Sequence, residues 1–274
     1  MTLTLFLQGG LGNQLFQWAS ATVLARAINL PLRINTSDYL LNNDQRELEI
    51  SKLIRSSSIS YSTDNEGFLL RRNPVSQFFA KRKYGALIDD NNYLETSKFY
   101  NVQSLMMRGY FQNYEYFDDH KSELMLATEN PKNGAVINDF SEYISIHVRR
   151  QDYLALQDIY EILDTNYYIQ ACQAVNSIHP NSKFLLFGDD KLFCEGLMHN
   201  LQERSINVTL VPGQKNTALN DFTLMRACAG HIIANSTFSW WAAYLSKDSK
   251  VTIRPRNWYT DGHCVNCPNN WIKI

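Results

Sequence analysis

The sequence predicts an α/β protein with two doubly wound domains, each built around a parallel sheet. Two observations carry this prediction. Short β-branched and apolar runs alternate with segments of helical periodicity in both halves of the 274-residue chain. A polar breaker run at residues 129–134 (ENPKNG) separates the two series. We therefore expect an N-terminal domain at residues 1–134 and a C-terminal domain at residues 135–274, whose tail can pack back on the first domain.

The first half opens as a βαβ unit. Residues 2–7 and 30–35 predict strands, and between them apolar side chains recur at helical spacing, at Leu15, Ala19, Val23 and Ala27. Residues 103–112 predict a further strand, and residues 114–128 predict a helix. Between residues 36 and 101 the periodicity is weak, and the sequence predicts no elements there.

In the second half, strands and helices alternate strictly. Strands are predicted at residues 143–148, 183–187, 207–211, 231–234 and 251–254. Helices are predicted at residues 166–177, 191–202, 218–228 and 236–245. This alternation indicates a parallel sheet, and open sheets of that kind bind ligands at the carboxyl ends of their strands.

The composition is typical of a globular protein. Apolar residues make up 45% and charged residues 19%, and the net charge is −1 with a pI of about 6.6. A basic footprint for nucleic acid is absent. No apolar run approaches the roughly 18 residues of a membrane span. The run at residues 3–7 lacks the basic flank of a signal peptide, so we expect a cytoplasmic protein.

The strand at residues 143–148 delivers a polar cluster to its carboxyl end. The cluster consists of His147, Arg149, Arg150 and Asp152. Because a guanidinium group offers a fork of donors that matches phosphate oxygens, the cluster predicts a site for a phosphorylated ligand. A surface salt-bridge cluster is the alternative, since structural ion networks resemble functional ones.

A glycine-rich turn follows the first strand. Gly10 and Gly12 let the backbone approach a ligand, and the amino end of the next helix favours an anion. The spacing at residues 9–14 (GGLGNQ) is not the G-x-G-x-x-G of dinucleotide sites, and no acidic residue stands at the ribose position. A nicotinamide-dependent oxidoreductase is therefore disfavoured. A plain turn remains the alternative to a ligand site.

Two other strand ends carry ligand-type residues. Asp189 and Asp190 follow one strand, and we expect one carboxylate to bind guanine through its N1–H and amino groups while the other caps a helix. Asn235, Ser236 and Thr237 begin another helix. Their side-chain oxygens and backbone amides predict a phosphate site, with ordinary helix capping as the alternative.

Metal ligation has little support in the sequence. No two aspartates are separated by a single residue, so the Asp-x-Asp motif common in metal-dependent sugar-nucleotide enzymes is absent. Cys264 and Cys267 have the spacing of half a zinc knuckle, but no second cysteine pair or histidine pair accompanies them. We expect no metal, with arginine and helix ends neutralising the ligand.

Five motifs occur in order along the chain. They are residues 10–17 (GLGNQLFQ), 109–112 (GYFQ), 147–153 (HVRRQDY), 187–190 (FGDD) and 235–241 (NSTFSWW). Together they resemble the bacterial α-1,2-fucosyltransferases of glycosyltransferase family 11. The family usually has glycine where this chain has Gln151, so specificity is not carried over at that position. The resemblance implies two facing Rossmann-like domains of the GT-B type and no cofactor besides GDP-fucose, the donor substrate.

The resemblance also implies a reaction, the inverting transfer of L-fucose from GDP-β-L-fucose to the 2-hydroxyl of a terminal galactose, which forms an α-1,2 linkage in a glycan or O-antigen. The N-terminal domain would be the acceptor side. Arg149 would hold the β-phosphate, and Asn13 would lie over the fucose. The implied donor-binding residues are His147, Arg149, Arg150, Asp189, Asp190, Asn235, Ser236, Thr237, Phe238, Gly10, Gly12 and Gln14.

The galactose hydroxyl must lose a proton during transfer, and a base within hydrogen-bond reach would help. Asp152 is the first candidate, because it follows Arg149 on the same loop. Pairing with Arg150 and orientation of the acceptor are alternative roles for Asp152.

Two alternatives concern the whole protein. A catalytically weak sugar-nucleotide or glycan-binding protein of the same fold is the main alternative to an enzyme. Peripheral contact with the inner membrane is a second possibility, since the basic residues 81–83 lie beside Phe78 and Phe79. A solvated helix face is the other interpretation of that run.

Overall fold

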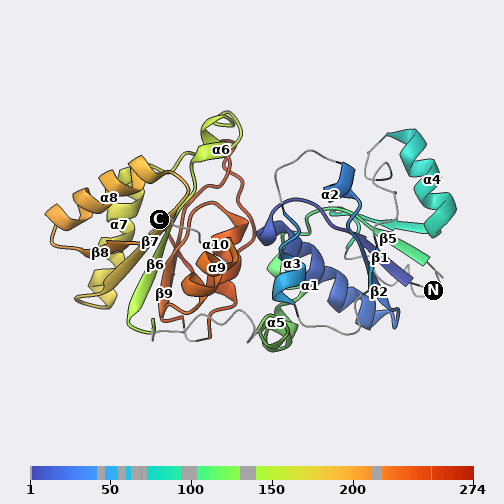
Figure 1. Ribbon diagram of the computed structural model, residues 1–274, viewed down its shortest axis with the longest axis horizontal. Coiled ribbons are helices and arrows are strands. Elements are labelled where there is room, and N and C mark those ends of the chain that lie inside the picture. Colours follow the sequence, from blue (N-terminus) through green and yellow to red (C-terminus); the bar gives the residue numbers. More distant parts are fainter. Residues whose placement is uncertain are drawn as a thin grey trace. The chain divides into compact units, whose positions relative to one another are not determined.

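The computed structural model describes residues 2–41, 47–54, 60–62, 69, 73–93, 104–129, 140–211, 218–247 and 249–274. The chain divides into two compact units, Met1–Asn130 and Pro131–Ile274 (Figure 1). Within each of the two sheets, all described neighbouring strands pair in parallel, so the predicted α/β class is confirmed. Residues 130–134 of the predicted linker lie outside the described residues.

The first unit holds a five-stranded sheet in the order β3-β2-β1-β5-β4. Its strands are β1 (Thr2–Phe6), β2 (Leu32–Asn35), β3 (Ser60–Ser62), β4 (Ala86–Ile88) and β5 (Ser104–Met107). Its helical elements are α1 (Leu11–Ala27), α2 (Asp38–Leu41), α3 (Ile50–Leu53), α4 (Pro74–Tyr84), η3 (Tyr114–Tyr116), η4 (Asp118–His120) and α5 (Lys121–Ala127). The strand order reverses between β1 and β5, and open parallel sheets bind ligands at such a switch point.

The structure corrects two elements predicted for this unit. The strand predicted at residues 103–112 ends early, because Gly109 and Phe111 take positive φ angles of 145° and 52° and turn the chain. The helix predicted at residues 114–128 consists of two 3₁₀ turns followed by α5. Its break falls at Phe117, which has a φ of −145° and is buried, so tertiary packing overrides the helical pattern.

The second unit holds a six-stranded sheet in the order β11-β10-β9-β6-β7-β8. Its strands are β6 (Tyr143–Val148), β7 (Lys183–Gly188), β8 (Asn207–Leu210), β9 (Gly230–Ile232), β10 (Val251–Arg254) and β11 (Ile272–Lys273). Its helices are α6 (Gln151–Leu154), α7 (Thr165–Ile178), α8 (Lys191–Glu203), α9 (Ala218–Arg226) and α10 (Thr237–Tyr244). Every strand and helix predicted for this half is present, and here the switch point lies between β6 and β9.

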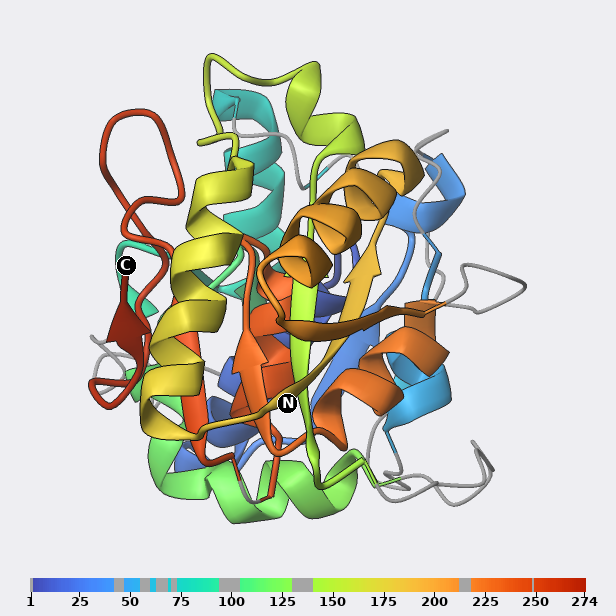
Figure 2. The same cartoon turned by 90° about the vertical axis from the view of Figure 1, so that its left-hand side faces the viewer.

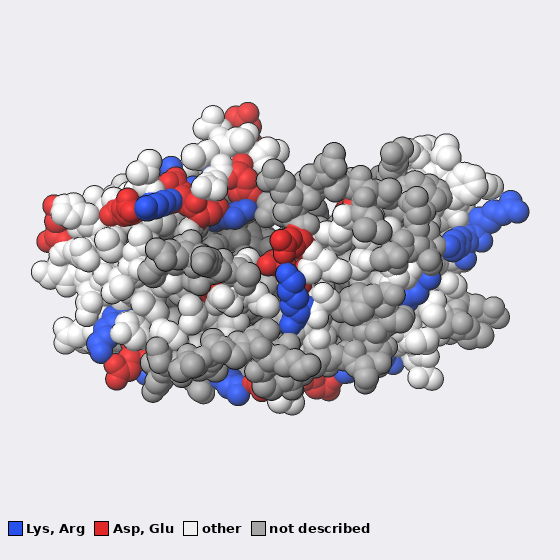
Figure 3. All heavy atoms as spheres, viewed as in Figure 1, with Lys and Arg blue, Asp and Glu red and all other residues white. Residues whose placement is uncertain are grey.

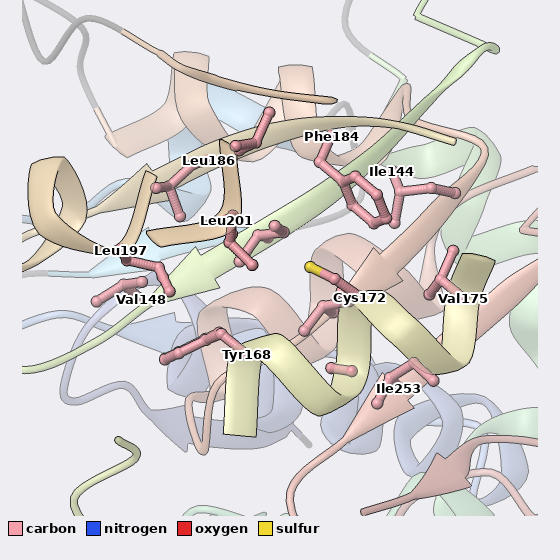
Figure 4. Packing of buried hydrophobic residues seen from close by; sticks show 14 of the residues in the cluster. Ile144, Val148, Tyr168, Cys172, Val175, Phe184, Leu186, Leu197, Leu201 and Ile253 are labelled. Carbon is pink, nitrogen blue, oxygen red and sulfur yellow. The ribbon is translucent and has the colours of Figure 1, made fainter. Parts of the chain in front are cut away.

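The two faces of β6 have different tasks in the second unit. Ile144, Ile146 and Val148 belong to the apolar core under α7 and α8, which Figure 2 shows crossing the front of the sheet and Figure 4 shows at close range. Side chains alternate across a strand, so Ser145 and His147 face the other side. There Ser145 Oγ lies 2.9 Å from His231 Nδ1. The core thus fixes which way the strand presents its polar residues.

Candidate functional site

Three of the sequence motifs meet at one edge of the second sheet. Residues 149–153 follow β6, residues 188–190 end β7, and residues 233–237 follow β9. Since β6 lies between β7 and β9 in a parallel sheet, the three segments emerge side by side at its carboxyl edge. This edge includes the switch point, so the topology brings together the residues that the sequence singled out.

Arg149 is held between two carboxylates. Its Nη2 donates to Asp152 Oδ2 over 2.6 Å, and its Nη1 forms an ion pair with Asp189 Oδ2 at 2.9 Å. The guanidinium group also lies over the Tyr153 ring, 5.7 Å from its centroid. The Arg149 side chain keeps 24% of its surface exposed. It is therefore oriented by neighbours and still accessible to a ligand, and Asp152 pairs with Arg149.

The sequence predicts that one of Asp189 and Asp190 caps a helix and that the other binds guanine. Asp190 Oδ1 accepts a hydrogen bond from the Phe193 amide at 3.1 Å and caps α8, so the predicted cap is confirmed. Asp189 Oδ1 accepts the amides of Arg150 and Gln151 at 2.8 and 3.4 Å. In this structure Asp189 fastens the loop that follows β6.

Arg150 is held by neighbouring groups. Its guanidinium group stacks over Phe193 at 4.1 Å from the ring centroid, and its Nη1 donates to the Leu163 carbonyl at 3.0 Å. Its Nε lies 3.4 Å from Asp190 Oδ2. These contacts involve Nε, Nη1 and the flat face of the guanidinium group, so Arg150 positions the loop in this structure, and the donor-binding role implied for it stays a prediction.

His147 is a buried polar residue at the end of β6. Its side chain lies against the Phe238 ring, with 5.5 Å between the ring centroids. Burial and, to a smaller extent, the nearby Arg149 charge together lower the pKa of His147 to about 3. The imidazole is therefore neutral at pH 7. Within the described part of the chain, its Nδ1 atom has no hydrogen-bond partner, which is costly for a buried nitrogen unless a ligand supplies one.

The amino end of α10 follows β9, the strand that pairs with β6, which carries His147. Asn235 Nδ2 donates to the carbonyls of Glu161 and Trp258 at 2.8 and 2.9 Å, so Asn235 ties two loops to β9. Ser236 occupies the N-cap position of α10 without a side-chain capping bond. Ordinary capping by Asn235 or Ser236 is therefore not what these side chains do. The first-turn amides of α10 lack an intrahelical acceptor and suit an anion.

The glycine-rich turn lies at the switch point of the first unit. Gly9 takes a φ of 79°, and Gly10 precedes α1. The Gln14 amide is fully buried and donates to the carbonyls of Gly9 and Glu47, both at 2.9 Å. Its oxygen accepts the amides of residues 49 and 50. These bonds use all four of its hydrogen-bonding positions, so Gln14 positions the turn in this structure, and the donor-binding role that the resemblance implied for it stays a prediction.

Sequence reasoning missed two residues beside this turn. Gln112 Nε2 donates to Asn13 Oδ1 at 2.9 Å and so orients the asparagine. Asp90 Oδ1 accepts the amides of Tyr110 and Phe111 at 3.1 and 2.6 Å and holds the turn in which Phe111 is left-handed. The signal that could have found Gln112 is the position of residues 109–112 after a strand that neighbours β1.

The described residues contain no group of three or more His, Cys, Asp or Glu side chains placed to hold a metal ion. Cys264 is exposed, whereas Cys267 is buried, donates to the Val265 carbonyl, and has its pKa raised to about 12 by burial.

Among the helices that the structure describes, none is both long and apolar enough to span a membrane.

The chain is similar to known proteins, two of which match nearly its whole length. Alpha-1,2-colitosyltransferase of Escherichia coli is 27% identical over 285 residues, which cover 98% of this chain and 97% of that protein. O-antigen biosynthesis glycosyltransferase WbnK of Escherichia coli is 27% identical over 303 residues, covering 98% and 99%. Galactoside 2-alpha-L-fucosyltransferase SEC1 of Bos taurus is 30% identical over 117 residues, covering 41% of this chain and 31% of the relative.

A solved structure supports the fold. A variant of Arabidopsis thaliana FUT1 in complex with GDP superimposes with a TM-score of 0.55 at 13% identity, covering 89% of this chain and 69% of that one. At this identity the match shows a shared fold, and the predicted GT-B class is confirmed. The model of glycosyl transferase family 11 matches residues 1–274, so the resemblance seen in the sequence motifs is confirmed. This chain belongs to glycosyl transferase family 11.

Proposed function

We propose that this glycosyltransferase moves L-fucose, with inversion, from GDP-β-L-fucose to the 2-hydroxyl of a terminal galactose. The observation that carries the proposal is the set of donors at the β6–β9 switch point. Arg149 supplies a partly exposed guanidinium group, α10 supplies the amides of its first turn, and His147 supplies a buried nitrogen that lacks a partner in the described structure. The guanidinium group and the helix amides suit the diphosphate of a nucleotide sugar, and the histidine suits its nucleoside.

In this proposal the second unit binds GDP and takes up the charge of the leaving group. Cleavage of the bond between fucose and the diphosphate leaves a dianion, and donors that are already oriented stabilise it without reorganisation. Arg149 holds the β-phosphate, and Ser236 and Thr237 hold the diphosphate at the start of α10. Phe238 packs on His147, which contacts the guanosine in its neutral form. Asp189 keeps the proposed guanine contact in addition to fastening the loop.

The geometry changes the role that we assign to Asp152, the candidate base. Asp152 shares one oxygen with Arg149 in a 2.6 Å hydrogen bond, so we assign it to the orientation of that guanidinium group. The first unit supplies the acceptor side, with Asn13 acting on the fucose and Gly10 and Gly12 allowing close backbone approach. No divalent ion takes part in this scheme, because the cation and the helix end balance the diphosphate.

Colitosyl transfer is a second candidate, favoured by the match to the colitosyltransferase of Escherichia coli. Colitose lacks the 3-hydroxyl of fucose, and a site that hydrogen-bonds a hydroxyl strongly rejects an analogue without it. The test is to incubate the protein with GDP-fucose or GDP-colitose and a panel of galactose-terminated oligosaccharides, and to determine the linkage of the product. We expect more α-1,2-fucosylated galactoside than colitosylated galactoside. A product made only from GDP-colitose would select the second candidate, and nucleotide binding without any product would indicate a binding protein.

The Gln112–Asn13 bond leads to a specific prediction. Replacing Gln112 with alanine should lower kcat about 10- to 100-fold, because Asn13 loses the group that orients it and small misplacements of a reacting-site residue are costly. The KM for the donor should change much less. Steady-state kinetics check this split, with the exposed Gln173→Ala as the matched control. An unchanged kcat would show that Asn13 needs no such support.

A further inference from the structure

Helix α4 is fixed in the first unit by one of its faces. It begins after Asn73, whose Oδ1 accepts the Ser76 amide at 2.8 Å, and it ends at Gly85 with a φ of 70°. Ala80 and Tyr84 are buried, and the Tyr84 ring meets Phe6 edge-on at 6.0 Å between centroids. The anchored face therefore decides which side chains α4 turns outward.

The outward face of α4 is apolar. Val75, Phe78 and Phe79 are 65%, 61% and 47% exposed. They stand at positions i, i+3 and i+4, so they form one stripe along the helix. The two phenylalanine rings lie edge-on, with 5.7 Å between their centroids. Isolated exposed apolar residues are ordinary, but a contiguous stripe that includes two aromatic rings marks an interaction surface.

Basic side chains border this stripe. Arg82 continues the stripe at position i+7, and Lys81 and Lys83 flank it, all three exposed. Figure 3 shows basic side chains gathered over one end of α4, beside uncharged ones that cover the rest of the helix. Basic residues in the last turn also suit the helix dipole, but that interaction does not account for two exposed phenylalanines.

The sequence around α4 is strongly cationic although the whole chain is not. Residues 67–88 contain five basic residues and no acidic residue, in a chain whose net charge is −1. A helix that combines an apolar stripe with clustered lysine and arginine complements an anionic lipid surface. A neutral bilayer or an apolar protein groove would contact the apolar stripe but would not interact favourably with the basic side chains.

We propose that α4 is a docking helix for an anionic lipid bilayer. Val75, Phe78 and Phe79 enter the boundary between headgroups and acyl chains, and Lys81, Arg82 and Lys83 lie on lipid phosphates. The contact is reversible, because a short interfacial helix buries little apolar area. This surface lies outside the residues proposed to bind the donor, so it acts independently of the proposed function.

Vesicle flotation tests the proposal with the full chain. We expect binding to vesicles of phosphatidylcholine with about one third phosphatidylglycerol, and weak binding to phosphatidylcholine alone. The variants Phe78→Ser/Phe79→Ser and Lys81→Glu/Arg82→Glu should each lower the partition coefficient at least about tenfold, since each basic residue near an anionic surface contributes about a fivefold factor. Raising the salt concentration should weaken binding of the unaltered protein. Melting temperatures of the variants should stay close to that of the parent, because the changed side chains face outward.

A matched control is the variant Leu126→Ser/Lys250→Glu, which removes one exposed apolar and one exposed basic side chain elsewhere. It should bind vesicles as the parent does. The proposal is overturned if anionic vesicles do not bind, if neutral vesicles bind equally well, or if the control loses as much binding as the α4 variants. A concentration-dependent dimer that Phe78→Ser/Phe79→Ser abolishes, without vesicle binding, would assign the stripe to a second copy of the chain and also overturn it.

Discussion

Replacing Arg149 with alanine is expected to lower kcat about 100- to 1000-fold, which is the usual cost of removing one oriented donor from a developing negative charge. Arg149 is the guanidinium group at the carboxyl end of β6 that stays partly exposed while two carboxylates orient it. Its loss should leave the fold intact, because Asp189 still accepts the amides of Arg150 and Gln151. Single-turnover kinetics with saturating donor measure the effect on transfer.

Two further variants make the Arg149 experiment specific. Arg149→Lys should recover only part of the rate, since an ammonium group keeps the charge but not the planar fork. Arg26→Ala should be fully active, because Arg26 forms an exposed ion pair with Glu123 in the first unit. If Arg149→Ala retained most of its activity with an unchanged melting temperature, the assignment of the β-phosphate to Arg149 would be wrong.

The second large effect is expected from proline at residue 237. Thr237 is the first helical residue of α10, where proline is tolerated, and proline there removes one backbone donor from the proposed diphosphate site. The preceding Ser236 already has φ −134° and ψ 128°, which is the conformation that a residue before proline prefers. We therefore expect Thr237→Pro to fold normally and to lose about 100-fold in kcat.

The matched control for that experiment is Thr237→Ala. Alanine removes the hydroxyl and keeps the amide, so the ratio of the two variants isolates the backbone donor. Thermal melting and steady-state kinetics of both variants are the measurements. Equal activity of the proline and alanine variants would mean that the amide of residue 237 does not stabilise the leaving group.

The fold of the second unit was predictable because local signals agreed with tertiary structure. The apolar alternation in β6 matches its burial, and α7 and α8 begin at the aspartates Asp164 and Asp190, whose side chains cap them. In residues 36–101 the local sequence patterns do not agree with the tertiary structure. Strand β3 and helices α2 and α3 are too short to show a period. Helix α4 buries Ser76 and exposes Phe78 and Phe79, so its pattern runs against the rule that apolar residues lie inside.

The candidate site was predictable in position and less so in the roles of single residues. Motifs at strand ends must meet in a parallel sheet, so the sequence located the edge that holds Arg149 and Ser236. Whether a polar side chain reaches a ligand or a backbone carbonyl depends on distances that no motif contains. Gln14, Arg150 and Asn235 turned out to hold the backbone around the site, and no spacing in the sequence distinguishes that task from binding.

A crystal structure of the protein with GDP tests the central claim most directly, because the claim concerns where the charge of the leaving group is held. The account predicts a β-phosphate within hydrogen-bond distance of the Arg149 guanidinium group and of the amides at the start of α10, with no metal ion bridging the phosphates. A diphosphate bound away from both groups, or held through a divalent ion, would contradict it.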